Sequence, residues 1–456
     1  MKNMTKHPLR ITADALKTAF LLEGFQLYDN GEYPELERAE VNVKIFENPG
    51  AVKKPVLLEE GQYALRTQLL PFALPAMGRD GRLPAAVSGK VFDGSCAAHP
   101  AHLLIEGVLP GTLSLYDIGV LWKKIARRAF GAACDAETVK CSGRRAGSDL
   151  ASWGSSAMTD NTLAEPDTWE IRVSGPEEKS FVLGYFGTMT WLGSALLGAA
   201  GAGNCFAFSI DVDSAAVWSL GLADREALFN NTQEFLGGFA DGSVSATEAF
   251  EDRCRDVLRA LGYTEGYGPK IYPDGIYKKM NMIQDEWDLN NKGVQLAEPL
   301  GDQTGLPTVL TPAIEQILSE KWAAGETCAR AFEISHIFMP QKDGAPIEKL
   351  ALSFGAYGED MDLGTFKEEV GDFLTKIGNK NHFYVPTGLA IAYNTKECLL
   401  LLDEKMSYLG GNFGGISEKA ERNFGIGTHA YMANLELLPL KNKADEEYGY
   451  IAPELR

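Results

Sequence analysis

Residues 203–229 read GNCFAFSIDVDSAAVWSLGLADREALF and contain the strongest strand and helix signals of the chain. Aromatic and apolar side chains fill residues 206–212, which predicts a buried strand. Residues 214–220 follow without a break and predict a helix, and a short loop then leads to Ala223, Asp224 and Arg225. We therefore expect a sheet in which one apolar strand runs directly into a helix.

The composition predicts a globular protein of two domains. The chain has 456 residues, with 45% apolar and 23% charged side chains, which is enough for two cores. Its seven cysteines are scattered and never spaced as CxxC, so they indicate reduced thiols in a cytoplasmic protein. Residues 1–10 lack the apolar segment of a secretory signal.

Charge and hydropathy argue against two classes of partner. The net charge is −19 and there is no basic stretch, so tight binding to tRNA phosphates is not expected. Residues 180–210 carry no charge and are long enough to span a bilayer. Their six glycines and the lack of basic flanking residues favour buried strands instead, so we predict no membrane association.

The opening stretch resembles motif 3 of class II aminoacyl-tRNA synthetases, and above all the α subunit of bacterial phenylalanyl-tRNA synthetase. The sequence pattern of that family is matched at Phe206-Ala207-Phe208 and at Leu220-Gly221. Where the family has Glu-Arg, this chain has Asp213-Ser214. The family's arginine binds the ATP triphosphate, so the resemblance implies a degenerate ATP site at Asp213 and Ser214.

Upstream segments resemble the other motifs of the same family. Residues 7–9, HPL, open a helix that resembles motif 1, which in the family is a dimer-interface element. Residues 65–71, LRTQLLP, resemble the family's LRTHTSP and contain Arg66. Residues 89–107 resemble motif 2, with matches at Gly89, Val91, Phe92, His99, Glu106 and Gly107. Asp93 stands where the family has the arginine that contacts the α-phosphate, which adds Asp93 to the degenerate ATP site.

The resemblance also implies a set of ligand-binding residues. The position of Glu106 faces the ammonium group of the bound amino acid in the family. Residues 163–166, LAEP, resemble FTEP beside the family's phenylalanine pocket, but Asn161 and Leu163 replace its aromatic floor, so phenylalanine itself is not the expected ligand. The candidate ligand-binding residues are Glu106, Arg66, His99, Glu165, Asn161 and Leu163. We expect Glu106 to line a partly closed pocket near the others.

The second half resembles the β subunit of the same synthetase. Residues 241–243, DGS, mark a linker, and residues 255–263 and 330–338 resemble segments of the β subunit's catalytic-like core. We therefore expect an α+β fold with two class II synthetase-like modules, each an antiparallel sheet flanked by helices. Residues 1–240 form the α-like module and residues 241–456 the β-like module.

The site is predicted to lack the fixed cations that adenylation requires. Adenylation needs fixed positive charge at the ATP phosphates, which aspartate and serine cannot supply in place of arginine. Asp211 and Asp213 either bind Mg²⁺ or cap the following helix. His99 and His102, three residues apart, are a weak metal signal, and we assign no metal site and no catalytic residue.

Three functions remain open from the sequence. We prefer a synthetase paralogue that does not aminoacylate and binds an amino acid or a similar small ligand as a sensor or regulatory subunit, as a homodimer. The alternatives are a ligase that activates a carboxylate with ATP and Mg²⁺ through replacement cations such as Lys90, Arg144 or Arg145, and a protein-interaction scaffold.

Overall fold

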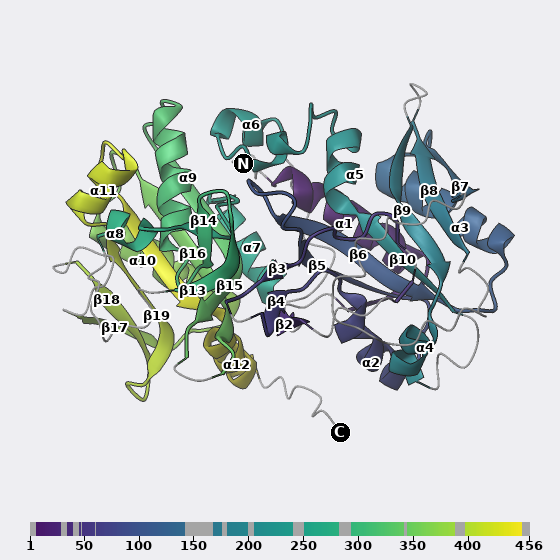
Figure 1. Ribbon diagram of the computed structural model, residues 1–456. Helices are drawn as coiled ribbons and strands as arrows, with labels where there is room; N and C mark the ends of the chain where they lie inside the picture. The colour runs from purple at the N-terminus through teal and green to yellow at the C-terminus, as the bar shows by residue number, and fades with distance from the viewer. Residues whose placement is uncertain are drawn as a thin grey trace.

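The computed structural model consists of two modules that lie side by side (Figure 1). It describes residues 6–28, 34–39, 45–46, 48–59, 61–141, 167–175, 180–198, 205–239, 250–281, 293–341, 344–387 and 397–448. The first module, purple to teal in Figure 1, and the second, green to yellow, each contain one large sheet and one small sheet.

The first module is built on a seven-stranded sheet in which every pair is antiparallel except β1 with β5. Its strands, in spatial order, are β1 (Gln26–Tyr28), β5 (Ala85–Phe92), β6 (Ala101–Leu109), β10 (Phe206–Asp211), β9 (Ser180–Thr188), β8 (Thr168–Ser174) and β7 (Asp135–Lys140). The helices α1 (Pro8–Leu22), α3 (Leu115–Phe130) and α5 (Val212–Ser219) contribute to the core on one face. The helices α2 (Leu70–Asp80) and α4 (Trp191–Leu197) contribute to the core on the other.

The second module repeats this plan. Its seven-stranded sheet contains, in order, β11 (Thr264–Glu265), β15 (Ala329–Met339), β16 (Ile347–Tyr357), β20 (Tyr431–Glu436), β19 (Tyr408–Gly415), β18 (Leu399–Asp403) and β17 (His382–Pro386). The helices α7 (Phe250–Ala260), α10 (Leu363–Ile377) and α12 (Leu437–Tyr448) contribute to one core. The helices α8 (Ile276–Lys279), α9 (Thr311–Ala323) and α11 (Glu418–Phe424) contribute to the other.

Strand order shows that the two modules have one topology. The large sheets run 1-5-6-10-9-8-7 and 11-15-16-20-19-18-17, so each strand of the second is numbered ten higher than its counterpart. The small sheets do the same: β2 (Leu36–Arg38), β4 (Tyr63–Leu65) and β3 (Val56–Leu57) correspond to β12 (Tyr272–Pro273), β14 (Gln303–Leu306) and β13 (Val294–Leu300). The predicted α+β architecture of two similar, helix-flanked modules is confirmed.

The strand and helix predicted from residues 203–229 are β10 and α5. Phe206, Phe208 and Ile210 of β10 alternate toward the core beneath α1, α3 and α5. Asp211 ends the strand and caps α5, because its Oδ1 accepts the Ser214 backbone N–H at 3.0 Å. Two short helices, η4 (Glu226–Phe229) and α6 (Gln233–Gly237), complete the module. The predicted linker at residues 241–243 lies outside the described residues.

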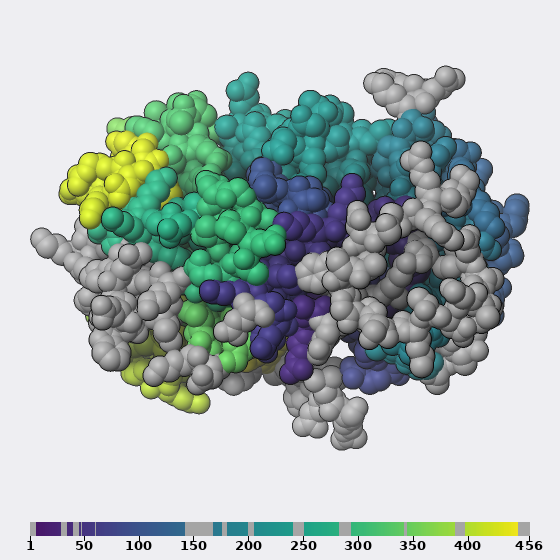
Figure 2. All heavy atoms as spheres, in the orientation of Figure 1, coloured from purple at the N-terminus to yellow at the C-terminus, as the bar shows by residue number. Residues whose placement is uncertain are grey.

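The two modules share a core and several polar contacts. Strands β3 and β13 pack together, and Leu58 forms an antiparallel bridge with Leu296. One apolar cluster draws on both modules, from Leu36, Val56, Leu58 and Leu65 to Val294, Leu296, Leu306 and Phe338. In the space-filling view the N-terminal segment, in purple, lies against the second module, in green (Figure 2).

The described helices include none that is both long and apolar enough to cross a bilayer.

Candidate ligand site between the two modules

Two small cavities lie where the modules meet. The first has a volume of about 70 Å³ and the second about 40 Å³. Arg10, Lys90 and Leu103 line both, so the two cavities adjoin. The polar residues that line the first are Arg10, Lys17, Glu35, Arg66, Ser88, Lys90, Glu251, Asp252, Arg255 and His336. Those of the second are Arg10, Lys90, His99, His102, Asp213, Tyr267 and Lys270.

Corresponding elements of both modules position these side chains. Helix α1 provides Arg10 and Lys17, and its counterpart α7 provides Glu251, Asp252 and Arg255. Strand β5 provides Lys90, and its counterpart β15 provides His336. The cavity walls are therefore formed by the helix and strand of each module that face the other module.

Glu35 joins the modules through a buried charge cluster. Its Oε1 lies 2.9 Å from His336 Nδ1 and 3.6 Å from Lys90 Nζ. Glu348 lies on the far side of the ring, with Oε1 3.4 Å from His336 Nε2, and its carboxylate accepts the backbone N–H groups of Glu35 and Leu36. Burial opposes ionisation of Glu35, but His336 and Lys90 outweigh it and hold its pKa well below the ordinary value.

Arg66, a predicted ligand residue, lines the first cavity and is 5% exposed. Its Nε donates to the Lys90 carbonyl at 2.6 Å and its NH1 to the Pro34 carbonyl at 3.0 Å. These bonds fix the guanidinium between β5 and the segment that carries Glu35. Arg66 therefore holds together the two backbone segments that carry Lys90 and Glu35.

Glu106, the second predicted ligand residue, is buried behind the first cavity. Its Oε2 accepts the backbone N–H groups of Leu69 at 2.6 Å and Leu70 at 3.1 Å, and so closes the N-terminus of α2, which has no side-chain cap of its own. Burial raises the pKa of Glu106, against the opposing effect of these amides, Ser209 and Arg66. Leu69 lines the cavity, and Glu106 is absent from the residues that line it. A contact between Glu106 and a ligand ammonium stays a prediction.

His99, the third, lines the second cavity. Its ring stacks on Phe229 with centroids 3.6 Å apart, and its Nε2 lies 3.2 Å from Glu226 Oε2. The structure thus brings Arg66 and His99 to adjoining cavities. Glu165, Asn161 and Leu163 lie outside the described residues, as do Arg144 and Arg145.

The residues predicted to form a degenerate ATP site have fixed structural partners. Asp93 accepts backbone N–H groups from Ser95 at 2.8 Å and from Lys53 and Lys54 at 3.3 Å. Burial opposes its ionisation, but these bonds outweigh burial and lower the pKa of Asp93. Ser214 donates its hydroxyl to Asp211 Oδ2 at 2.7 Å. Of the two roles the sequence left open for Asp211, the structure shows the helix cap.

Asp213 pairs with Arg225, a residue whose role the sequence did not reveal. Arg225 Nε donates to Asp213 Oδ2 at 2.8 Å, and its NH1 and NH2 donate to the carbonyls of His99 and Ala101. Burial and the nearby Asp211 raise the pKa of Asp213 to about 6, against the effect of Arg225. The pair ties the segment after α5 to the start of β6.

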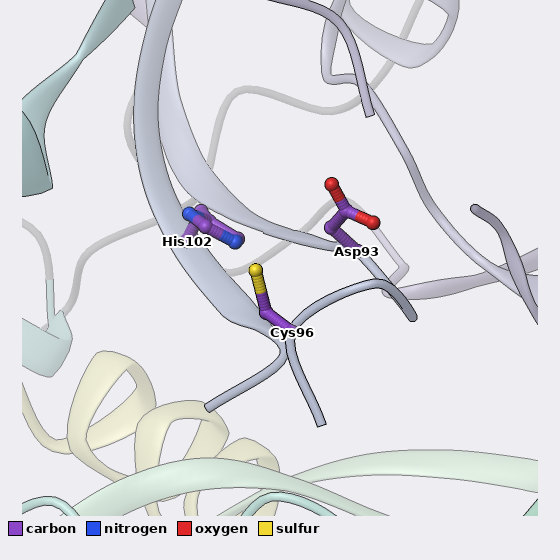
Figure 3. Close-up of side chains that lie close together, drawn as sticks. All are labelled: Asp93, Cys96 and His102. Atoms are coloured by element: carbon purple, nitrogen blue, oxygen red, sulfur yellow. The ribbon is translucent and has the colours of Figure 1, made fainter. Parts of the chain in front are cut away.

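Most of the charged residues that line the cavities could not be recognised as site residues from the sequence. Their neighbours in the sequence do not show that they belong to one site, because their partners lie in distant parts of the chain. This holds for Arg10, Glu35, Arg255 and His336. The backbone N–H of Glu35, for example, donates to a carboxylate 313 positions away. The one possible metal-ligand cluster found in the described part of the chain is Asp93, Cys96 and His102 (Figure 3). From the sequence, His102 was only part of a weak metal signal with His99, and no metal site was assigned.

In a comparison with known protein families, the match falls almost entirely on the second module. Residues 238–437 match the family model of the phenylalanyl tRNA synthetase beta chain CLM domain. The phenylalanine–tRNA ligase beta subunit of Clostridium tetani is 25% identical over 205 residues, which cover 44% of this chain and 25% of that subunit. That of Synechococcus sp. is 27% identical over 124 residues, 26% of this chain and 14% of the subunit. These matches thus span a quarter or less of each relative, and with them the chain is identified as a protein related to phenylalanyl-tRNA synthetase.

Proposed function

We propose that this protein is a phenylalanyl-tRNA synthetase paralogue that does not aminoacylate, and that it binds an amino acid or a similar small zwitterion between its modules. The observation that carries the proposal is the anchoring of Asp93. A carboxylate held by three backbone amides stands where the resemblance places the arginine for the α-phosphate.

The anchored carboxylates argue against adenylation. Positive charge must be fixed at the phosphates before the reaction, because negative charge develops there in the transition state. Asp93 cannot turn away without breaking bonds to its amides, and Asp213 already uses Arg225, the nearby cation. Asp93 therefore presents a fixed negative charge where the resemblance places the α-phosphate.

The cavities offer charges of both signs, as a zwitterion requires. Arg10 and Lys90 border both cavities, and Lys90 Nζ donates to Ser335 Oγ at 3.0 Å with one of its three protons. A ligand carboxylate can accept another. Glu35, Glu251 and Asp252 lie on the walls of the first cavity and supply negative charge for an ammonium.

No described contact favours the alternative of an ATP-dependent ligase. Lys90, one of the replacement cations that it requires, bonds to Ser335 of the second module and lies 3.6 Å from Glu35. A single lysine at the module boundary does not supply the fixed positive charge at both the α- and the γ-phosphate that adenylation needs.

The test combines exchange and binding measurements. We expect no ATP–pyrophosphate exchange with any standard amino acid, and calorimetric binding of at least one of them without ATP or Mg²⁺. Lys90→Met should weaken that binding about tenfold or more, the worth of a charge-assisted hydrogen bond. Lys54→Met is the matched control, since Lys54 Nζ pairs with Glu298 on the surface. Exchange activity, or binding that needs ATP, would refute the proposal.

Partners other than a small ligand are also proposals. The net charge of −19 supports weak tRNA binding at most, which fluorescence anisotropy at 150 mM salt can check. Pairing of two chains through α1 would use its last turn, where Leu21 is 43% and Leu22 60% exposed, because the other apolar residues of α1 are buried or half-buried in this chain. Light scattering of the parent and of Leu22→Glu tests the homodimer, and a monomeric parent would contradict it.

A further inference from the structure

Three side chains that commonly bind metals converge at the turn of the β5–β6 hairpin. A carboxylate oxygen of Asp93, the sulfur of Cys96 and a ring nitrogen of His102 all lie within 4.8 Å of one another. Figure 3 shows the Cys96 sulfur between the other two groups, with the His102 ring turned toward it.

The hairpin itself brings the three together. Val91 pairs with His102, and the next bond along joins the Asp93 N–H to the Pro100 carbonyl at 2.8 Å. Asp93 and His102 are therefore diagonal neighbours on one face of an antiparallel pair. Cys96 is drawn back over the strands because its N–H donates to the Asp93 carbonyl at 3.1 Å.

The surroundings of His102 and Asp93 orient both side chains for metal binding. His102 Nε2 is buried and has no hydrogen-bond partner among the described residues, and Nδ1 lies 3.8 Å from Asp213 Oδ2, a carboxylate that can orient the ring. The amides that hold Asp93 fix its orientation and leave it lone pairs for a metal.

We propose that Asp93, Cys96 and His102 bind one zinc ion, with a solvent molecule in the fourth position. A thiolate, an imidazole and a carboxylate together favour zinc over magnesium or calcium. Ligand atoms in a tetrahedral zinc site lie about 3.3–3.7 Å apart, from bond lengths of about 2.0–2.3 Å. Because the three atoms already lie within 4.8 Å of one another, the loop has to close by at most about 1.5 Å around the ion.

Binding at this site has a defined proton balance. The Cys96 S–H bond breaks, a sulfur–zinc bond forms, and the proton passes to solvent, with no change in oxidation state. The inference goes beyond the proposed function, and metal binding is measured without amino acid or ATP, so the failure of one can be told from the failure of the other.

The test uses the full-length chain, purified without a histidine tag and stripped with a chelator. Titration with Zn²⁺ should saturate at one equivalent, and Co²⁺ should produce a thiolate-to-cobalt charge-transfer absorption. Cys96→Ser should abolish that absorption, and His102→Gln and Asp93→Asn should each weaken binding at least about tenfold. Cys328→Ser, at an exposed cysteine in the second module, is the matched control and should change nothing.

Several results would overturn the site. Parent protein that binds no metal at micromolar concentration would do so, as would a cobalt absorption that survives in Cys96→Ser or disappears in Cys328→Ser. Circular dichroism and melting curves of each variant show whether it is folded. If Cys96→Ser does not fold, the His102→Gln and Asp93→Asn affinities decide the matter.

Discussion

At the scale of single residues, Glu315 is a buried carboxyl group on α9 of the second module. Neither of its carboxylate oxygens has a hydrogen-bond partner among the described residues. Burial raises its pKa well above the usual value, with Lys279 opposing and Glu421 adding to the shift. A carboxyl in such a site is held in its neutral form.

Replacement of Glu315 by glutamine should stabilise the protein at neutral pH. Because the pKa is raised on folding, the unfolded chain gives up its proton first, and stability falls as pH rises above about 4.3, the unfolded value. Glutamine does not titrate. Glu315→Gln should therefore melt at least about 2–4 °C higher than the parent at pH 8 and no higher at pH 4. Glu368→Gln, at an exposed position on α10, is the control, and an equal rise in both variants would contradict the explanation.

His429 shows the opposite dependence on pH. Hydrogen bonds to Glu421 at 2.7 Å and Glu397 at 3.0 Å raise its pKa to about 9, against the effect of burial. A raised histidine pKa gives stability that is complete below about pH 6.5 and lost as pH rises through 9. His429→Gln should thus melt about 2–4 °C lower than the parent at pH 6, because these half-exposed ion pairs contribute about 1 kcal/mol to the free energy of unfolding there. At pH 10 the variant and the parent should melt at the same temperature. If the melting temperature of the variant is lower by the same amount at both pH values, the substitution destabilises the protein through lost packing and not through the ion pairs.

The candidate site could be predicted in part at this scale. Arg66, His99 and Asp213 follow from short motifs, and the structure places all three on the walls of adjoining cavities. Glu35 and His336 could not be predicted, because each becomes a site residue only when the two modules meet. The role of Glu106 at the N-terminus of α2 depends on a contact 36 and 37 positions away, which motif spacing does not encode.

At the scale of elements, alternation and motif order were enough to predict the sheet. The apolar side chains of β10 face the core under α1, α3 and α5, and the helix begins where the alternation ends. Gly107 shows a requirement that alternation does not reveal. A Cβ at Gly107 would lie 2.3 Å from the Ala85 carbonyl and 2.5 Å from the Phe208 ring. The motif glycine thus lets β6 pass between β5 and β10.

Alanine at Gly107 should destabilise the first module by about 1–3 kcal/mol or more, as overpacking of a core does. The comparison is Gly119→Ala on α3, where a Cβ would meet only the Thr138 hydroxyl, at 3.9 Å. That change should stabilise by up to about 1 kcal/mol through helix propensity. Urea unfolding with an unchanged m-value measures both. Equal midpoints for the two variants would contradict the role given to Gly107.

At the scale of the whole molecule, the same sheet topology occurs twice along the chain. Each module has its own large sheet and its own cores, yet the small sheets share one apolar cluster. Arg10 and Glu265 bond across the boundary at 3.3 Å, and Glu348 caps the Glu35 segment. The boundary near residue 240 stays a prediction, because residues 240–249 lie outside the described part.

If the modules behave as subunits, they should assemble without a covalent link. We expect residues 1–240 and 241–456, expressed together as separate chains, to copurify in a 1:1 complex through a tag on one of them. Leu296→Asp should reduce the recovery about tenfold or more, because Leu296 is 7% exposed in the shared cluster and a charge there has no partner. Ala297→Asp, on the exposed face of the same strand β13, should leave recovery unchanged. If residues 241–456 elute alone as a folded monomer, the second module is independent, and the cavities at the boundary cannot couple a ligand to the arrangement of the modules.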